Sequence, residues 1–192
     1  MQHTPFSRIA GMLGIAGVLF WWVALLIEYQ FNLFTPGGAL SYFDQGLFLI
    51  GQCCYLICVL GLLRSGVAGD GWGARAAVGA FLLGQALLVI GVVISLIVGT
   101  NELVIMPIGG LLTSLGALFS GLLVLRAGRW RGWTRYAPLA LGLYFLALVL
   151  RAIITGNEPT LPLELVWQLP WLLIGLGLTQ HAVPEQPTLA AV

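Results

Sequence analysis

The stretch "LRAGRWRGWTR", residues 125–135, contains four of the eight arginines, and the chain has no lysine. The sequence on both sides of this stretch is almost wholly apolar. A basic segment of this kind is typical either of a nucleic-acid-binding patch or of a loop that anchors a membrane protein. The composition and the positions of the other charges distinguish these two interpretations.

The composition indicates a polytopic membrane protein. Of the 192 residues, 59% are hydrophobic and 8% are charged, and the mean hydropathy is +1.00. Soluble domains carry about 25% charged residues, so a soluble protein of this length would lack the charge that its surface needs. The net charge of +1 gives no general attraction to nucleic acid. We therefore expect the lipid bilayer, and not nucleic acid, as the partner of this chain.

Six apolar runs are long enough to cross a bilayer. A spanning helix needs about 20 mostly apolar residues, because the hydrocarbon core is about 30 Å thick. The sequence predicts an all-α fold in one domain, residues 1–192, with six transmembrane helices. The predicted spans are about 8–27, 44–63, 75–98, 104–125, 137–154 and 163–179.

Seven of the eight arginines fall on one side of the membrane when the six spans alternate in direction. Arg8 precedes the first span, Arg64 and Arg75 flank the loop after the second, and four lie in residues 125–135. Because cytoplasmic loops are enriched in arginine, we expect both termini in the cytoplasm, and the short loops favour a bacterial inner membrane. The residues expected to set the topology and to contact lipid headgroups are Arg126, Arg129, Trp130, Arg131, Trp133 and Arg135.

Five of the seven acidic residues fall on the opposite, outer side. Arg151 lies plainly within a span, about four residues from its outer end. A charge inside a span is a functional candidate, although an arginine near the interface can also extend to the headgroups. We predict that Arg151 closes the outer mouth of the bundle by pairing with an acid. The candidate partners are Glu102, Glu158 and Glu164; the other two outer acids are Glu28 and Asp44.

A weak repeat of about 60 residues divides the chain into three helical hairpins, residues 7–64, 74–126 and 134–181. "SRIA", "ARAA" and "TRYA" each open an outward-going span, and "GTNELVIMP" and "TGNEPTLP" occupy two of the outer turns. Any hairpin with inner arginines and an outer turn shares these features. Internal triplication and chance similarity therefore both remain open.

Small residues recur at every fourth position of the fourth predicted span. Residues at this spacing share one face of a helix, and small residues let helix backbones approach closely in a membrane. We expect this face to be buried against neighbouring helices. The residues are Gly109, Thr113, Ala117 and Gly121.

Two amides lie near the middle of the second and third spans, Gln52 and Gln85. An amide in hydrocarbon needs a hydrogen-bonding partner. The two side chains either bond each other or a backbone carbonyl, or they line a polar permeation path.

The sequence carries no motif of a metalloprotease, a phosphate-binding loop or a serine hydrolase. We expect no enzymatic activity, no cofactor and no metal, and we interpret Cys53, Cys54 and Cys58 as packing residues. The expected function is that of a structural or interaction subunit, packed against other membrane protein subunits or against copies of itself. The alternative is a channel or transporter for a small cation or polar solute, with the outer acids as its vestibule.

Overall fold

The structure is a computed structural model that describes residues 5–31, 38–99, 105–155 and 160–180. These residues are all-helical, without strands, and six of the helices are long and apolar enough to span a membrane. The prediction of an all-α, six-span fold is confirmed. The helices are α1 (Pro5–Phe31), α2 (Ala39–Ser65), α3 (Trp72–Val98), α4 (Ile105–Ala127), α5 (Ala137–Thr155) and α6 (Leu161–Gln180), with a short 3-10 helix, η1 (Trp133–Tyr136), before α5.

Most of the helices are longer than the apolar runs that predicted them. The first helix continues to Phe31, through Glu28, and the second begins at Ala39, five residues before the predicted span. Helix ends tolerate polar residues, so hydropathy marks the part of a helix in the hydrocarbon and not the whole helix. Pro170 lies inside α6, which stays helical on both sides of it.

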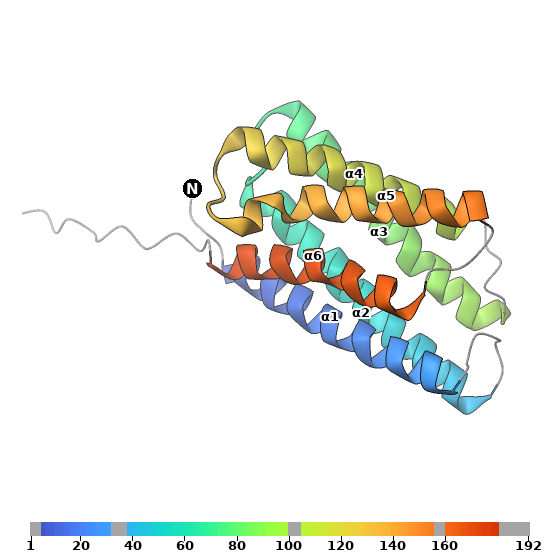
Figure 1. Cartoon of the computed structure of the whole chain (residues 1–192). Coiled ribbons are helices and arrows are strands. Elements are labelled where there is room, and N and C mark those ends of the chain that lie inside the picture. The colour runs from blue at the N-terminus through green and yellow to red at the C-terminus, as the bar shows by residue number, and fades with distance from the viewer. Residues whose placement is uncertain (1–4, 32–37, 100–104, 156–159, 181–192) are drawn as a thin grey trace, which may run out of the picture.

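The six helices follow one another around a closed ring in chain order (Figure 1). Each helix contacts the next, α6 contacts α1 to close the ring, and α2 also reaches α6. The start of α1, the end of α6 and the loops after α2 and α4, which have arginines in or beside them, gather at one end of the bundle, which we call the arginine end. The opposite end, where α1, α3 and α5 finish, is called the acidic end.

The three predicted hairpins are not equivalent in their packing. The pairs α1–α2 and α3–α4 make the most extensive contacts, whereas α5 and α6 touch each other much less. The sixth helix packs mainly on α1, where Trp22 Nε1 donates a hydrogen bond to the carbonyl oxygen of Leu165 over 3.3 Å. The internal triplication therefore stays a prediction.

Glycines lie where neighbouring helices come closest. A Cβ atom added at Gly116 of α4 would lie 2.3 Å from the backbone nitrogen of Phe81 on α3. A Cβ added at Gly121 would lie 2.3 Å from the backbone nitrogen of Leu139 on α5. Both distances are too short for any real contact, so only glycine fits at these crossings. The small-residue ladder of α4 is buried throughout, at Gly109, Thr113, Ala117 and Gly121.

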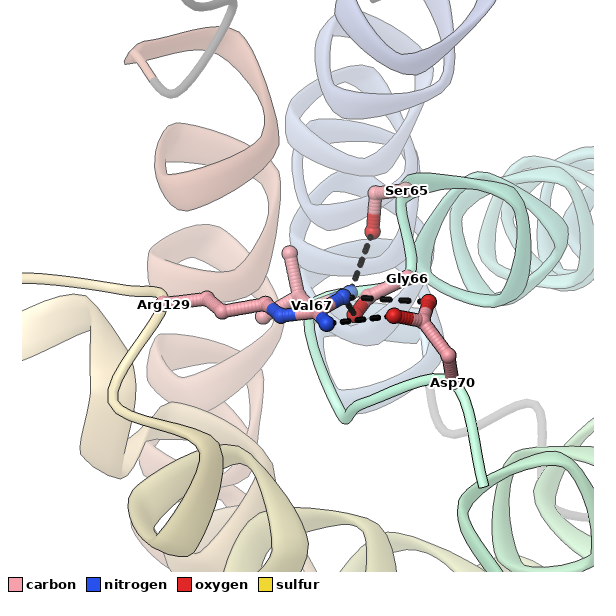
Figure 2. A network of polar contacts seen from close by, with 5 residues as sticks. All are labelled: Ser65, Gly66, Val67, Asp70 and Arg129. Atoms are coloured by element: carbon pink, nitrogen blue, oxygen red, sulfur yellow. Dashed lines mark hydrogen bonds and ion pairs between the residues drawn. The ribbon is translucent and has the colours of Figure 1, made fainter. Parts of the chain in front are cut away.

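At the arginine end, Arg129 joins the loop after α4 to the loop after α2 (Figure 2). Its guanidinium pairs with both carboxylate oxygens of Asp70, at 3.1 and 2.5 Å, and donates to the carbonyl oxygen of Gly66 at 2.6 Å. The hydrogen bond from the Arg129 guanidinium lowers the pKa of Asp70 below its ordinary value of 3.8. The contribution of the pair to stability is thus present above pH 3.8 and lost as the pH falls through the lowered pKa. The pair is exposed, so its contribution is small.

Two of the expected lipid anchors, Trp130 and Arg129, make contacts within the protein. Trp130 is only 1% exposed and packs on Gly177 of α6, so it does not reach the headgroups. Arg129 pairs with Asp70 and is exposed, so it stays a predicted lipid contact. Trp133 is 83% exposed, as an interfacial anchor requires. Arg126, Arg131 and Arg135 stay predicted lipid contacts, and all three are exposed.

The glycine crossings generate a matched pair of stability predictions. Gly116→Ala should destabilise the protein by about 1–3 kcal/mol, because the added methyl group forces α3 and α4 apart. Gly79→Ala should be neutral or should stabilise by up to about 1 kcal/mol, because a Cβ there meets no atom within 4 Å. Thermal unfolding of both variants in one detergent measures the difference. Equal melting temperatures would contradict the assigned α3–α4 crossing.

The orientation in the membrane is tested by cysteine labelling in a background without native cysteines. Trp133→Cys and Trp72→Cys lie at the arginine end and Tyr42→Cys at the acidic end, and all three positions are exposed. In intact cells, a membrane-impermeant maleimide should label only residue 42, because the arginine end is predicted to be cytoplasmic. Opened membranes should label all three, which controls for reactivity. External labelling of residue 133 would reverse the assignment.

Candidate functional site: the bundle interior and its acidic end

The middle of the bundle contains a relay of three polar side chains from three helices. Gln85 Nε2 on α3 donates a hydrogen bond to Gln52 Oε1 on α2 at 3.1 Å, and Thr113 Oγ1 on α4 donates to Gln85 Oε1 at 3.4 Å. All three residues are buried. Of the two sequence interpretations of these amides, the structure shows the one in which they bond each other. The relay connects α2, α3 and α4 in the middle of the bundle.

Beside this relay, aromatic rings fill the centre of the ring of helices. Trp171 of α6 stacks on Tyr55 of α2 with ring centroids 4.2 Å apart and planes 7° apart, and it contacts Phe81 of α3 at 5.5 Å. The hydroxyl of Tyr55 donates a hydrogen bond to Oε1 of Gln168, which lies one helical turn before Trp171 on α6. These residues are almost completely buried. We call Tyr55, Phe81, Gln168 and Trp171 the central plug.

A second group of aromatic rings lies between the plug and the acidic end. Trp21 of α1 contacts Phe48 of α2 at 4.5 Å and Trp167 of α6 at 5.1 Å, in both cases edge to face. Trp167 also stacks on Phe145 of α5 at 4.7 Å. The rings thus connect α2, α1, α6 and α5 through contacts between neighbouring side chains. Trp21 Nε1 and Trp167 Nε1 are buried and make no hydrogen bond within the described part of the chain.

Asp44 of α2 lies near these rings, and it is buried. Its side chain is only 1% exposed, and Oδ1 has no hydrogen-bonding partner among the described residues. The sequence placed Asp44 among the outer acids at a helix end, but the helix begins five residues earlier and the side chain faces inward. An ionisable group inside a predicted span is a functional candidate by default.

Arg151 is partly buried near the end of α5, and its Nη1 atom is buried without a hydrogen-bonding partner in the described ranges. Of its predicted partners, Glu102 and Glu158 lie outside the described residues. Glu164 is partly buried in the first turn of α6. The pairing of Arg151 therefore stays a prediction.

The cysteines of α2 are free thiols, and Cys54 and Cys58 are buried. A Cβ atom added at Gly14 of α1 would lie 2.6 Å from Cys58 Sγ, which shows that this thiol packs tightly in the α1–α2 contact. Within the described ranges, no three His, Cys, Asp or Glu residues lie close enough together to hold a metal ion.

Comparisons of the chain with protein-family models, with curated proteins and with solved structures found no match. The candidate site therefore rests on geometry alone.

Sequence reasoning identified the two central glutamines and the buried ladder of α4, but not the aromatic rings of the interior or the burial of Asp44. One signal was available for Asp44. Residues of α2 at alternating spacings of three and four form a single stripe, and every member is buried or partly buried. Continuing that stripe outward from Tyr55 would have placed Asp44 inside the bundle. The stripe consists of Ser41, Asp44, Phe48, Gly51, Tyr55, Cys58 and Leu62.

The Arg151 pairing generates a prediction on stability. Arg151→Gln should lower the free energy of unfolding by about 1–3 kcal/mol, because a charge-assisted hydrogen bond would be lost. Arg135→Gln, the same change at an exposed arginine at the other end, should have little effect. A double-mutant cycle with Glu164→Gln then identifies the partner, since additive losses exclude Glu164. Unchanged thermal unfolding of Arg151→Gln would contradict the pairing altogether.

Proposed function

We propose that this chain is an integral protein of a bacterial inner membrane, with both termini in the cytoplasm. In this proposal it is a structural or interaction subunit that packs against a larger membrane assembly or against copies of itself. The topology is supported by the arginines, because six of the eight lie in or beside the loops after α2 and α4, which are at one end of the bundle together with the start of α1.

The single observation that carries this function is the central plug. A channel or carrier needs a polar route past the middle of its spans. Here the ring of helices is closed by contacts between all neighbours, and Trp171 is stacked on Tyr55 and in contact with Phe81 at its centre. The two glutamines that could line such a route are bonded to each other. A filled interior supports a role in which the outer surface of the bundle binds other subunits.

A second candidate is a channel or transporter for a small cation. One observation favours it: Asp44, a carboxylate, is buried near the acidic end with Oδ1 unpaired among the described residues. Transport would require the plug to open, since the rings of Tyr55 and Trp171 lie between Asp44 and the arginine end.

The two candidates differ in assembly and in flux. The subunit proposal expects a defined oligomer, or one companion at fixed stoichiometry, after extraction in a mild detergent and native mass spectrometry. It also expects potassium and sodium flux no greater than in empty vesicles when the purified protein is reconstituted. The Trp171→Leu variant is measured beside the wild type. It removes the stacked ring while keeping an apolar side chain, and so tests whether the plug is what blocks flux. A monomer that conducts cations in its wild-type form would overturn the subunit proposal.

A further inference from the structure

The position of Asp44 follows from how α1 and α2 pack. Trp21 of α1 lies against Gly51 of α2, where an added Cβ would be 2.5 Å from the indole ring, and Gly17 lies against Tyr55. Asp44 lies seven residues outward of Gly51 on the same stripe of α2, so it belongs to the buried face of the helix. Its 1% exposure agrees with that placement.

Aromatic residues follow Asp44 inward along the buried face of α2 and on the facing side of α1. Phe48 is one helical turn, about 6 Å, further into the bundle on the same face of α2. The ring of Phe48 meets the edge of Trp21, and Trp21 in turn meets Trp167. Indole and phenyl faces attract cations, and this attraction is strongest where water is excluded.

One oxygen of the Asp44 carboxyl group lacks a hydrogen-bonding partner among the described residues, which points to a ligand. A carboxylate buried without a cation or a hydrogen-bond donor is costly, and it is most costly inside a membrane span. Oδ1 of Asp44 is buried and accepts no hydrogen bond from the described residues. A cationic donor at Oδ1 would remove that cost.

The chemistry of the surroundings selects the kind of cation. Calcium and magnesium need about six oxygen ligands, and no group of three potential metal ligands occurs among the described residues. One carboxylate with aromatic rings beneath it suits a weakly hydrated organic cation, as in the aromatic cages that bind ammonium groups.

We propose that Asp44, with Phe48 and Trp21 beneath it, binds a small organic ammonium ion at the acidic end of the bundle. The N–H groups of the ammonium donate to the carboxylate, and its carbon atoms contact the rings. The site lies outward of the central plug. Binding therefore requires no passage through the bundle and does not depend on the proposed subunit role.

The test is isothermal titration of the purified full-length chain in an uncharged maltoside detergent. The probe is n-butylammonium chloride, with sodium chloride at equal ionic strength and n-butanol as the two controls. The expected result is saturable binding of n-butylammonium, with no saturable binding of either control. Sodium tests for charge alone, and butanol tests for partition of the alkyl chain alone.

Variants at Asp44 and Phe48 test whether n-butylammonium binds at this site. Asp44→Asn should weaken n-butylammonium binding at least tenfold, as expected when a charged partner of a buried pair is removed. Asp70→Asn removes an exposed carboxylate at the arginine end and should leave the affinity unchanged. Phe48→Leu should weaken binding about two- to fivefold, the range of a single cation–π contact. Phe48→Tyr keeps the ring and should retain the affinity.

Two results would overturn the proposal. One is an absence of saturable n-butylammonium binding to the wild-type chain. The other is unchanged affinity in Asp44→Asn, which would mean that this carboxyl group is a neutral structural side chain. Should Asp44→Asn fail to fold, the Phe48 pair decides in its place, because equal affinities of Phe48→Leu and Phe48→Tyr would exclude the ring from the site.

Discussion

Close approach of helix backbones at glycine is the constraint on which this bundle depends. In a bilayer the lipid chains are as apolar as leucine, so burying leucine against another helix gains little. Association must come from dense contact, and dense contact requires that side chains be absent where helices cross. Gly116 against Phe81, Gly121 against Leu139 and Gly175 against Gly11 supply such crossings in three different helix pairs. Loosely packed pairs, such as α5 and α6, are where the ring would open first.

Polar groups inside the bundle are only partly paired. At the centre, Gln52, Gln85 and Thr113 form one relay and Tyr55 bonds to Gln168, whereas Gln168 Nε2 and Trp171 Nε1 have no hydrogen-bonding partner among the described residues. Those nearer the acidic end include buried groups without a partner among the described residues. These are Asp44 Oδ1, Arg151 Nη1, Trp21 Nε1 and Trp167 Nε1. The hydrogen bonds at the centre join neighbouring helices, and the proposed ammonium site uses the unpaired Oδ1 of Asp44 near the acidic end.

The arginine-rich stretch serves two purposes. Its position in the chain supports the predicted topology, because arginines resist transfer across the membrane. Two of its residues also make contacts within the protein: the exposed Arg129 joins two loops through Asp70, and the buried Trp130 packs on Gly177 of α6. The remaining arginines and Trp133 stay at the surface. The same segment thus connects α2, α4 and α6 at one end, and the predicted topology rests on it.

The sequence by itself determined the class of fold, the number of spans and the buried ladder of α4. Each depends on local composition or spacing, namely twenty apolar residues for a span and a four-residue interval for one helix face. Only the tertiary structure decided which side chains meet across helices. The plug joins Tyr55, Phe81 and Trp171 from three helices far apart in the chain, and hydropathy counts such residues as apolar wherever they point. Asp44 looked like a solvent-exposed helix end because the helix starts before the apolar run does, and only packing against α1 showed that its carboxylate is buried.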